Sequence, residues 1–240
     1  VLSGEMCPPG LKHLCDKLGI SRRVIASDSV SFQLAPTINS AGRLGEPFTA
    51  FTALADNEDN SEKAVQKLIS LNKKRKKLCL DDLDLALSII RKYSYNRDYS
   101  IIIVGEFNDG LMGIIASRLV EIYNLPAIVF CKDSSEPGMI KGSGRAPDNF
   151  DLYRVLCSCS RFLKKFGGHS AAAGMSIDEK YFDLFAAAFD ETSKRVIEDG
   201  KRLHQNSQNQ KKDIELPVSE ALNPILVKNI LQLEPLGEAN

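Results

Sequence analysis

Residues 141–145, Lys-Gly-Ser-Gly-Arg, combine the side chains and backbone that anion binding requires. The glycines expose backbone N–H groups, Ser143 adds a hydroxyl donor, and Lys141 and Arg145 add positive charge. This composition is typical of an anion-binding loop, but it lacks the spacing before a Lys-Ser or Lys-Thr pair that defines a P-loop. The alternative is a twisted edge strand without a ligand.

A second cluster, residues 34–45, places small residues around Asn39 and Arg43. Small residues allow the backbone to approach a ligand closely, and a guanidinium offers paired donors that match phosphate oxygens. We expect this segment to be a loop that binds phosphate. The alternative is a tight interdomain turn with an arginine on its surface.

The third cluster, residues 166–174, contains a histidine next to glycines and alanines. Gly167 and Gly168 are expected to end a helix, and His169 to begin a strand of very small residues. Small side chains leave room above a strand, which favours a ligand, although a lone histidine is more often structural. Because strand ends of an open α/β sheet meet at one crevice, we predict that His169 and residues 141–145 share a site.

The remaining charged residues predict no catalytic centre. Hydrolysis of a phosphodiester by metal ions needs several Asp or His ligands that converge. Asp82 and Asp84 are suitably spaced but lie in a lysine-rich helical surface, so we expect no metal ligands and no catalytic residues in this chain. The basic run 73–77 is either a solvated helix face or a track for a phosphate backbone.

The pattern of apolar residues predicts the elements that position these clusters. Residues 1–57 are expected to form a mainly helical remnant, and residues 58–95 a long connecting helix with a break near Leu78–Leu80. From residue 96, strands alternate with helices, beginning with the apolar run 101–104 and a helix capped by Asn108-Asp109-Gly110. Asp151 is expected to cap another helix. The fold class is therefore α/β, with a mixed, mostly parallel sheet and helices on both of its faces.

Composition limits the class of protein. The 240 residues are 43% hydrophobic, and 31 basic residues balance 31 acidic ones, so nucleic-acid affinity must come from local patches. The six cysteines lack metal-ligand spacing, and several lie in apolar stretches typical of reduced thiols. With no apolar run long enough for a membrane, we expect a soluble, cytoplasmic protein. The sequence starts with Val1 rather than methionine, and we interpret it as a fragment.

Four strings together resemble the RecJ family of single-stranded-DNA exonucleases, in the DHH phosphoesterase superfamily. They are LAPTINSAGRLG at 34–45, GLMGIIASRLVEIYNLPAIVF at 110–130, KGSGRA at 141–146 and FGGHSAAAGMSI at 166–177, in the family's order and spacing. The resemblance covers most of the chain, and the string at 34–45 narrows it to RecJ-like members.

The resemblance implies a domain order. Residues 1–57 are similar to the C-terminal tail of the DHH catalytic domain and 58–95 to its connecting helix. Residues 96–200 resemble the DHH-associated, substrate-binding domain, and 201–240 a linker and the start of an OB-fold domain. The family's Mn²⁺ or Mg²⁺ ligands belong to motifs with no counterpart here, so metal binding and catalysis are expected outside this fragment.

The resemblance also implies a function. It predicts the substrate-binding half of a metal-dependent 5′–3′ exonuclease that acts in DNA repair and recombination on single strands, with repair partners unknown. By this resemblance, Asn39 and Arg43 are expected to face the active-site cleft from the catalytic side, and Ser143, Arg145, Gly168 and His169 to hold the nucleotide from the other side. The alternatives are an oligoribonuclease or cyclic-dinucleotide phosphodiesterase of the superfamily, or a non-catalytic single-strand-binding relative.

Two positions depart from the family pattern. Phe107-Asn108-Asp109-Gly110 stands where the family has Trp-His-Pro-Gly, so a histidine contact is replaced. Thr37 stands where a basic residue is common, which predicts a weaker phosphate contact.

Overall fold

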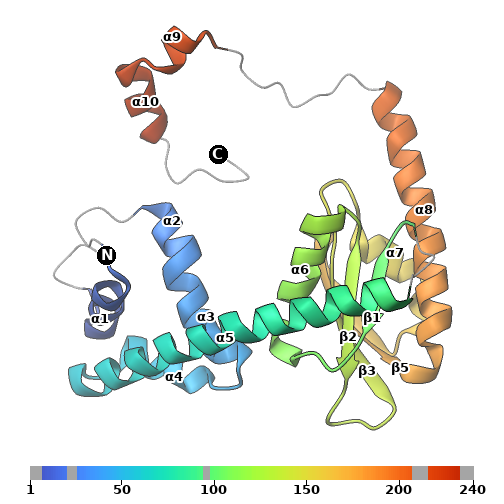
Figure 1. The fold of residues 1–240 in the computed structure, drawn as a ribbon, viewed down its shortest axis with the longest axis horizontal. Coiled ribbons are helices and arrows are strands. Elements are labelled where there is room, and N and C mark those ends of the chain that lie inside the picture. The colour runs from blue at the N-terminus through green and yellow to red at the C-terminus, as the bar shows by residue number, and fades with distance from the viewer. Residues whose placement is uncertain (1–6, 21–25, 94–97, 207–215, 233–240) are drawn as a thin grey trace.

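The computed structural model describes residues 7–20, 26–93, 98–206 and 216–232, in which one long helix joins a helical N-terminal part to an α/β part (Figure 1). The N-terminal part contains α1 (Pro9–Leu18), α2 (Ser27–Ser29), the π-helix η1 (Val30–Leu34), α3 (Ala35–Arg43) and α4 (Pro47–Ala55). Their apolar faces surround fully buried residues such as Leu14 and Leu68, the latter from the long helix. The mainly helical N-terminal part is confirmed.

Helix α5 (Glu58–Tyr93) is continuous, so the predicted break near Leu78–Leu80 is wrong. No glycine or proline interrupts this stretch, and each half is supported by a different core. Val65 and Leu68 pack in the N-terminal part, whereas Ala86 and Ile90 pack beneath the sheet. A long helix can therefore persist without one uninterrupted apolar face.

The α/β part is a five-stranded sheet in the order β1-β2-β3-β5-β4. Its strands are β1 (Ile101–Val104), β2 (Ala127–Lys132), β3 (Met139–Arg145), β4 (Lys165–Gly168) and β5 (Ala172–Asp178). Its helices are η2 (Asp109–Leu111), α6 (Met112–Tyr123), α7 (Leu152–Ser158), η3 (Ser160–Phe162), η4 (Glu179–Tyr181) and α8 (Phe182–Asn206). The α/β class is confirmed.

The sheet is mixed but mostly antiparallel, which corrects the expectation of mostly parallel strands. Only β1 and β2 pair in parallel, because they are the only neighbouring strands that are joined through a crossover helix, α6, whereas β3 and β4, joined through α7, are separated by β5. Residues 133–138 and 169–171 are connections too short for a crossover, so the strands that they join are antiparallel. One of these strands, β4, includes Gly167 and Gly168, which were expected to end a helix.

Helices cover both faces of the sheet, as predicted. On one face α5 and α6 pack on β1 and β2, around residues such as Ile103, Ile115 and Val129. On the other face α7 and α8 pack around Phe130, Leu156 and Phe185. Asp151 caps α7 as expected, since its carboxylate accepts a 2.9 Å hydrogen bond from the Arg154 N–H.

Two short helices follow, α9 (Val218–Ala221) and α10 (Pro224–Leu231), which contact each other. The predicted linker falls partly in α8, which continues to Asn206, and partly in 207–215, outside the described residues. Among the described helices, none is both long and apolar enough to cross a membrane.

Candidate functional site

Strand β3 sorts the residues of the 141–145 cluster onto two faces of the sheet. Side chains alternate along a strand, so Lys141, Ser143 and Arg145 share one face. The glycines between them point to the opposite face. A side chain at Gly142 would collide with the Phe130 ring, so a tightly packed core requires glycine there. The cluster is therefore a strand, as the alternative interpretation held, but an interior strand between β2 and β5 and not an edge strand, and it carries a row of polar groups.

The neighbouring strands continue this polar face with very small residues. Ser143 pairs with Gly174, which pairs with Gly167, and Arg145 pairs with Ala172. At both Gly167 and Gly174 the space that a side chain would fill is open. The room above the strand that the small residues predicted is thus present beside Ser143 and Arg145, and we call this surface of β3, β5 and β4 the open face.

Arg145 is half-buried beside the open face. Its Nη1 donates hydrogen bonds to the Gly144 carbonyl, at 2.7 Å, and to Ser143 Oγ, at 3.2 Å. Burial, together with the nearby positive charge of Arg43, lowers the pKa of the Arg145 guanidinium below its usual value. Among the described residues neither arginine forms an ion pair, so two cations lie close together without a compensating anion.

Arg43 reaches this site from the last turn of α3, a helix and not the loop that was expected. Its Nη1 donates to the Gly110 carbonyl at 3.1 Å, which joins the N-terminal part to the turn before α6. Only glycine fits at 110, because an added Cβ would lie 2.0 Å from the Arg43 carbonyl oxygen. Asn39 is exposed one helical turn before Arg43, on the same side of α3.

The N-terminus of α6 lies directly against Ser143 and Arg145. A Cβ at Gly113 would lie 2.6 Å from Arg145 Nη2 and 3.0 Å from Ser143 Oγ. The first turn of a helix presents N–H groups without partners in the helix and the positive end of its dipole, both of which favour an anion. Sequence reasoning missed this element, although the glycine at the start of a predicted helix was a signal for it.

His169 lies in the connection between β4 and β5. Its backbone N–H donates to the Ala172 carbonyl at 2.8 Å, and Ala172 is the residue paired with Arg145. Its ring Nδ1 accepts a 3.3 Å hydrogen bond from the Ala171 N–H, which assigns the proton of the neutral ring to Nε2. The exposed ring therefore offers a donor across β5 from Arg145.

Gly168 has a φ of 150°, and an added Cβ would lie 2.3 Å from the Ala172 carbonyl oxygen. It pairs with Ala173, which in turn pairs with Gly144, so it belongs to the row that faces α7, not to the row of Arg145. The structure therefore brings Arg43, Ser143, Arg145 and His169 to one end of the open face, with Gly168 in the strand edge beside them, and Asn39 lies one helical turn from Arg43.

The two departures from the family pattern have structural roles. Asn108 does not cap α6, and its side chain binds the buried Asp82 carboxylate of α5 at 3.0 Å. Thr37 is buried, where its hydroxyl donates to the Gln33 carbonyl and accepts from Asn72. Neither side chain is available to a ligand at the open face.

The acidic residues form no metal site in the part of the chain that the structure describes, where no group of three or more His, Cys, Asp or Glu side chains could hold an ion. The lysines of the run 73–77 are exposed on α5. The arrangement as a whole suits an anion with an attached group that is flat or extended: two guanidinium groups and a helix N-terminus bind the charge, and the open face accommodates the remainder.

Comparison with known proteins indicates the family to which this chain is similar. Residues 98–195 match the DHHA1 domain. The chain is 33% identical to the single-stranded-DNA-specific exonuclease RecJ of Bacillus subtilis over 169 residues, and 31% identical to that of Escherichia coli over 194 residues. These matches cover 70% and 77% of this chain, but 21% and 33% of the two relatives.

The fold agrees with these matches. The crystal structure of Thermus thermophilus RecJ in complex with Mg²⁺ superposes with a TM-score of 0.76 and 28% identity, over 97% of this chain and 34% of that one. The chain is a RecJ-type segment. It spans a fifth to a third of the length of the curated RecJ proteins that it matches.

Proposed function

We propose that this RecJ-type chain is the substrate-binding part of a metal-dependent 5′–3′ exonuclease that acts on single-stranded DNA in repair and recombination. The observation that carries the proposal is the pair of guanidinium groups, Arg43 and Arg145, which lie at the N-terminus of α6 without an acidic partner in the described parts of the chain. Two close cations repel each other, and a phosphate between them relieves that repulsion. The names of the relatives, single-stranded-DNA-specific exonucleases, support the choice of ligand.

Each site residue then has a role. Arg145 and Arg43 bind the phosphate from two sides, Ser143 and His169 donate hydrogen bonds to it or to the sugar, and Asn39 lies beside Arg43. The backbone at Gly168 shapes the edge next to His169. The small residues of β5 leave space for the nucleoside. These residues orient the strand and stabilise charge, which are the contributions that a substrate clamp makes to hydrolysis.

The metals of such an enzyme are not held by the residues described here. Structures of Thermus thermophilus RecJ contain Mg²⁺ or Mn²⁺. Because the described residues of this chain do not form a group of metal ligands, we propose that the divalent ions are bound by parts of the protein outside this chain. A divalent ion supplies Lewis acidity and activates water in such hydrolases, and we assign no step of that chemistry to these residues.

The proposal includes a domain assignment and a location. Residues 1–57 are the tail of a DHH domain, 58–95 the connecting helix, 96–200 the DHHA1 domain, and 201–240 a linker and the start of an OB-fold domain. The protein is cytoplasmic, which is supported by its six cysteine thiols, four of them buried. Partners in repair are unknown.

Binding experiments on the whole chain test this function. We expect fluorescence anisotropy to show binding of a labelled single strand that weakens as salt increases, with a log–log slope near −0.7 per phosphate contacted. A duplex of the same sequence should bind less tightly, because bases stacked in pairs do not fit the open face. A dinucleotide that binds more tightly than the long strand contradicts the proposal and indicates a dinucleotide phosphodiesterase. Binding of none of the three ligands also contradicts it.

A further inference from the structure

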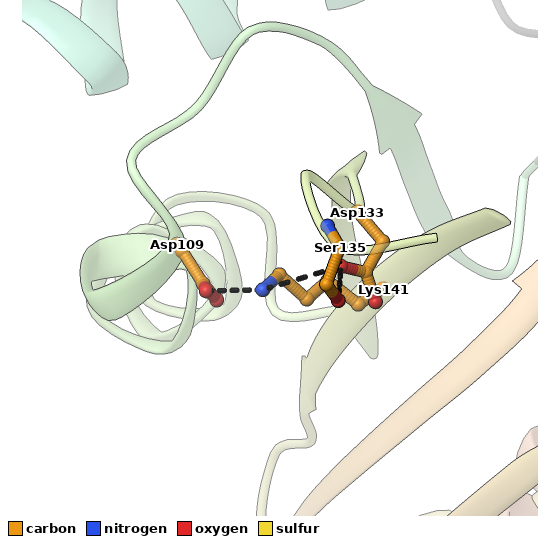
Figure 2. Close-up of polar contacts among 4 residues, drawn as sticks. All are labelled: Asp109, Asp133, Ser135 and Lys141. Atoms are coloured by element: carbon orange, nitrogen blue, oxygen red, sulfur yellow. Dashed lines mark hydrogen bonds and ion pairs between the residues drawn. The ribbon is translucent and has the colours of Figure 1, made fainter. Parts of the chain in front are cut away.

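Lys141 is the third basic residue of the row on β3, and it differs from the two arginines in having acidic partners. Figure 2 shows its ammonium group between two carboxylates. Lys141 Nζ forms a hydrogen-bonded ion pair with Asp109, and lies 4.0 Å from Asp133 Oδ1. The hydrogen bond to Asp109 is the main cause that raises the pKa of Lys141. The charge of Lys141 is therefore already compensated in this structure.

Of the two carboxylates, that of Asp109 is the direct partner of Lys141. The Asp133 carboxylate accepts hydrogen bonds from Ser135, at 2.9 Å from its N–H and 2.5 Å from its hydroxyl. These bonds are the main cause that lowers the pKa of Asp133, so this carboxylate is stabilised as an anion by its own turn. The Asp109 carboxylate accepts a hydrogen bond from the Lys141 ammonium group, and this contact joins η2 to β3.

The position of Asp109 connects this pair to the site. It directly precedes Gly110, whose carbonyl binds Arg43, and it begins the turn that leads into the N-terminus of α6. A carboxylate at this point lies in the same short segment that approaches Arg43 and Arg145. Lys141 itself stands two residues before Ser143 on the same face of the strand.

We propose that Asp109 withholds the Lys141 ammonium group from phosphates at the open face, and so limits how tightly the site holds a strand. This inference rests on the proposed function. Lys141 has a partly exposed side chain, and exposed ion pairs contribute little stability, so a phosphate can compete with Asp109 for the ammonium group. The phosphate then gains only the difference between its own interaction free energy with Lys141 and that of Asp109. A clamp that must release the strand after each step benefits from such a limit, because affinity is reduced chiefly through faster dissociation.

A double-mutant cycle tests the proposal. Asp109→Asn keeps the size of the side chain and removes its charge, and Lys141→Gln removes the cation. Asp133→Asn is the matched control, because it removes the negative charge of the carboxylate that lies farther from Lys141. We expect the Asp109→Asn chain to bind a labelled single-stranded oligothymidylate about three- to tenfold more tightly, between the values for an exposed pair and a hydrogen bond to a charged group. Its salt dependence should steepen by roughly 0.7, which corresponds to one more phosphate contact.

The effect must depend on Lys141. Asp109→Asn should give no gain in the Lys141→Gln background, and Asp133→Asn should give a smaller gain than Asp109→Asn. An equal gain with and without Lys141 overturns the proposal, since it shows a general effect of negative charge on the site. Wild-type affinity in the Asp109→Asn chain also overturns it.

A variant at Arg145 separates this failure from failure of the proposed function. If Arg145→Ala weakens binding but Asp109→Asn does not strengthen it, only the role of Asp109 is wrong. If no variant binds the oligonucleotide, both proposals are wrong.

Discussion

Replacing Arg145 with alanine removes the half-buried guanidinium on which the proposed clamp depends. Hydrogen bonds to charged groups contribute about 1.5–3 kcal/mol. The free protein already uses Nη1 in a 2.7 Å bond to the Gly144 carbonyl, so binding exchanges one acceptor for another. We therefore take the lower part of that range, about 1.5–2 kcal/mol, which is roughly ten- to thirtyfold in the dissociation constant.

The same substitution should not reduce stability. Arg145 and Arg43 are close cations without acidic partners among the described residues, so the free fold loses a repulsive interaction when one is removed. We expect an unchanged or higher Tm together with weaker binding. This opposite change in the two measurements distinguishes a ligand contact from a residue that supports the fold.

The assay is fluorescence anisotropy of a labelled single strand over a range of salt concentrations. Loss of one phosphate contact should make the log–log slope shallower by about 0.7. Arg154→Ala is the control: it removes the same charge from an exposed position on α7, on the face of the sheet opposite the site. Wild-type affinity in the Arg145 variant, or an equal loss in the Arg154 variant, refutes the reasoning.

Three further predictions test the open face, the loop before α6 and the continuity of α5. Gly174→Val fills the open space beside Ser143 and should reduce single-strand binding with little change in Tm; unaltered binding means that the ligand lies elsewhere. Asn108→Ala leaves the buried Asp82 carboxylate without two of its hydrogen bonds and should lower the unfolding free energy in urea by about 1–3 kcal/mol, and a neutral result contradicts the anchoring role. Leu80 is 64% exposed, so Leu80→Pro should lower the unfolding free energy by about 3 kcal/mol through the helix backbone alone, whereas Leu80→Ala should leave it unchanged. An unchanged unfolding free energy in the proline variant indicates a break in α5.

The sequence by itself determined the residue types of the site and the elements with strong periodicity. Arg145 and His169 were predicted as site residues because guanidinium, hydroxyl and imidazole groups stand among glycines, a composition that suits anion binding. Strand β1 and helix α6 followed from an apolar run and a 3.6-residue period, because the burial of a strand on both faces, or of a helix on one face, leaves a pattern of apolar residues within a short segment. The α/β class and the helical N-terminal part were predictable for the same reason.

Local patterns were ambiguous where residues are small. The segment around Arg43 was interpreted as a loop but is α3, and Gly167 and Gly168 were interpreted as a helix end but lie in β4. Glycine and alanine carry little information on which face is buried, so the partner elements decide the conformation. The direction of the strands was also misjudged, since it depends on which connections are long enough to cross the sheet.

Only the tertiary structure decided which charges meet. Arg43 and Gly110 are 67 positions apart, and their contact exists because a glycine lets α3 approach the turn before α6. The pairing of Lys141 with Asp109, in contrast to Arg145 and Arg43, which have no acidic partner among the described residues, likewise depends on how η2 packs beside β3. Charge is a property of single residues and can be read along a chain. Compensation of charge is a property of neighbours in space, and packing alone sets it.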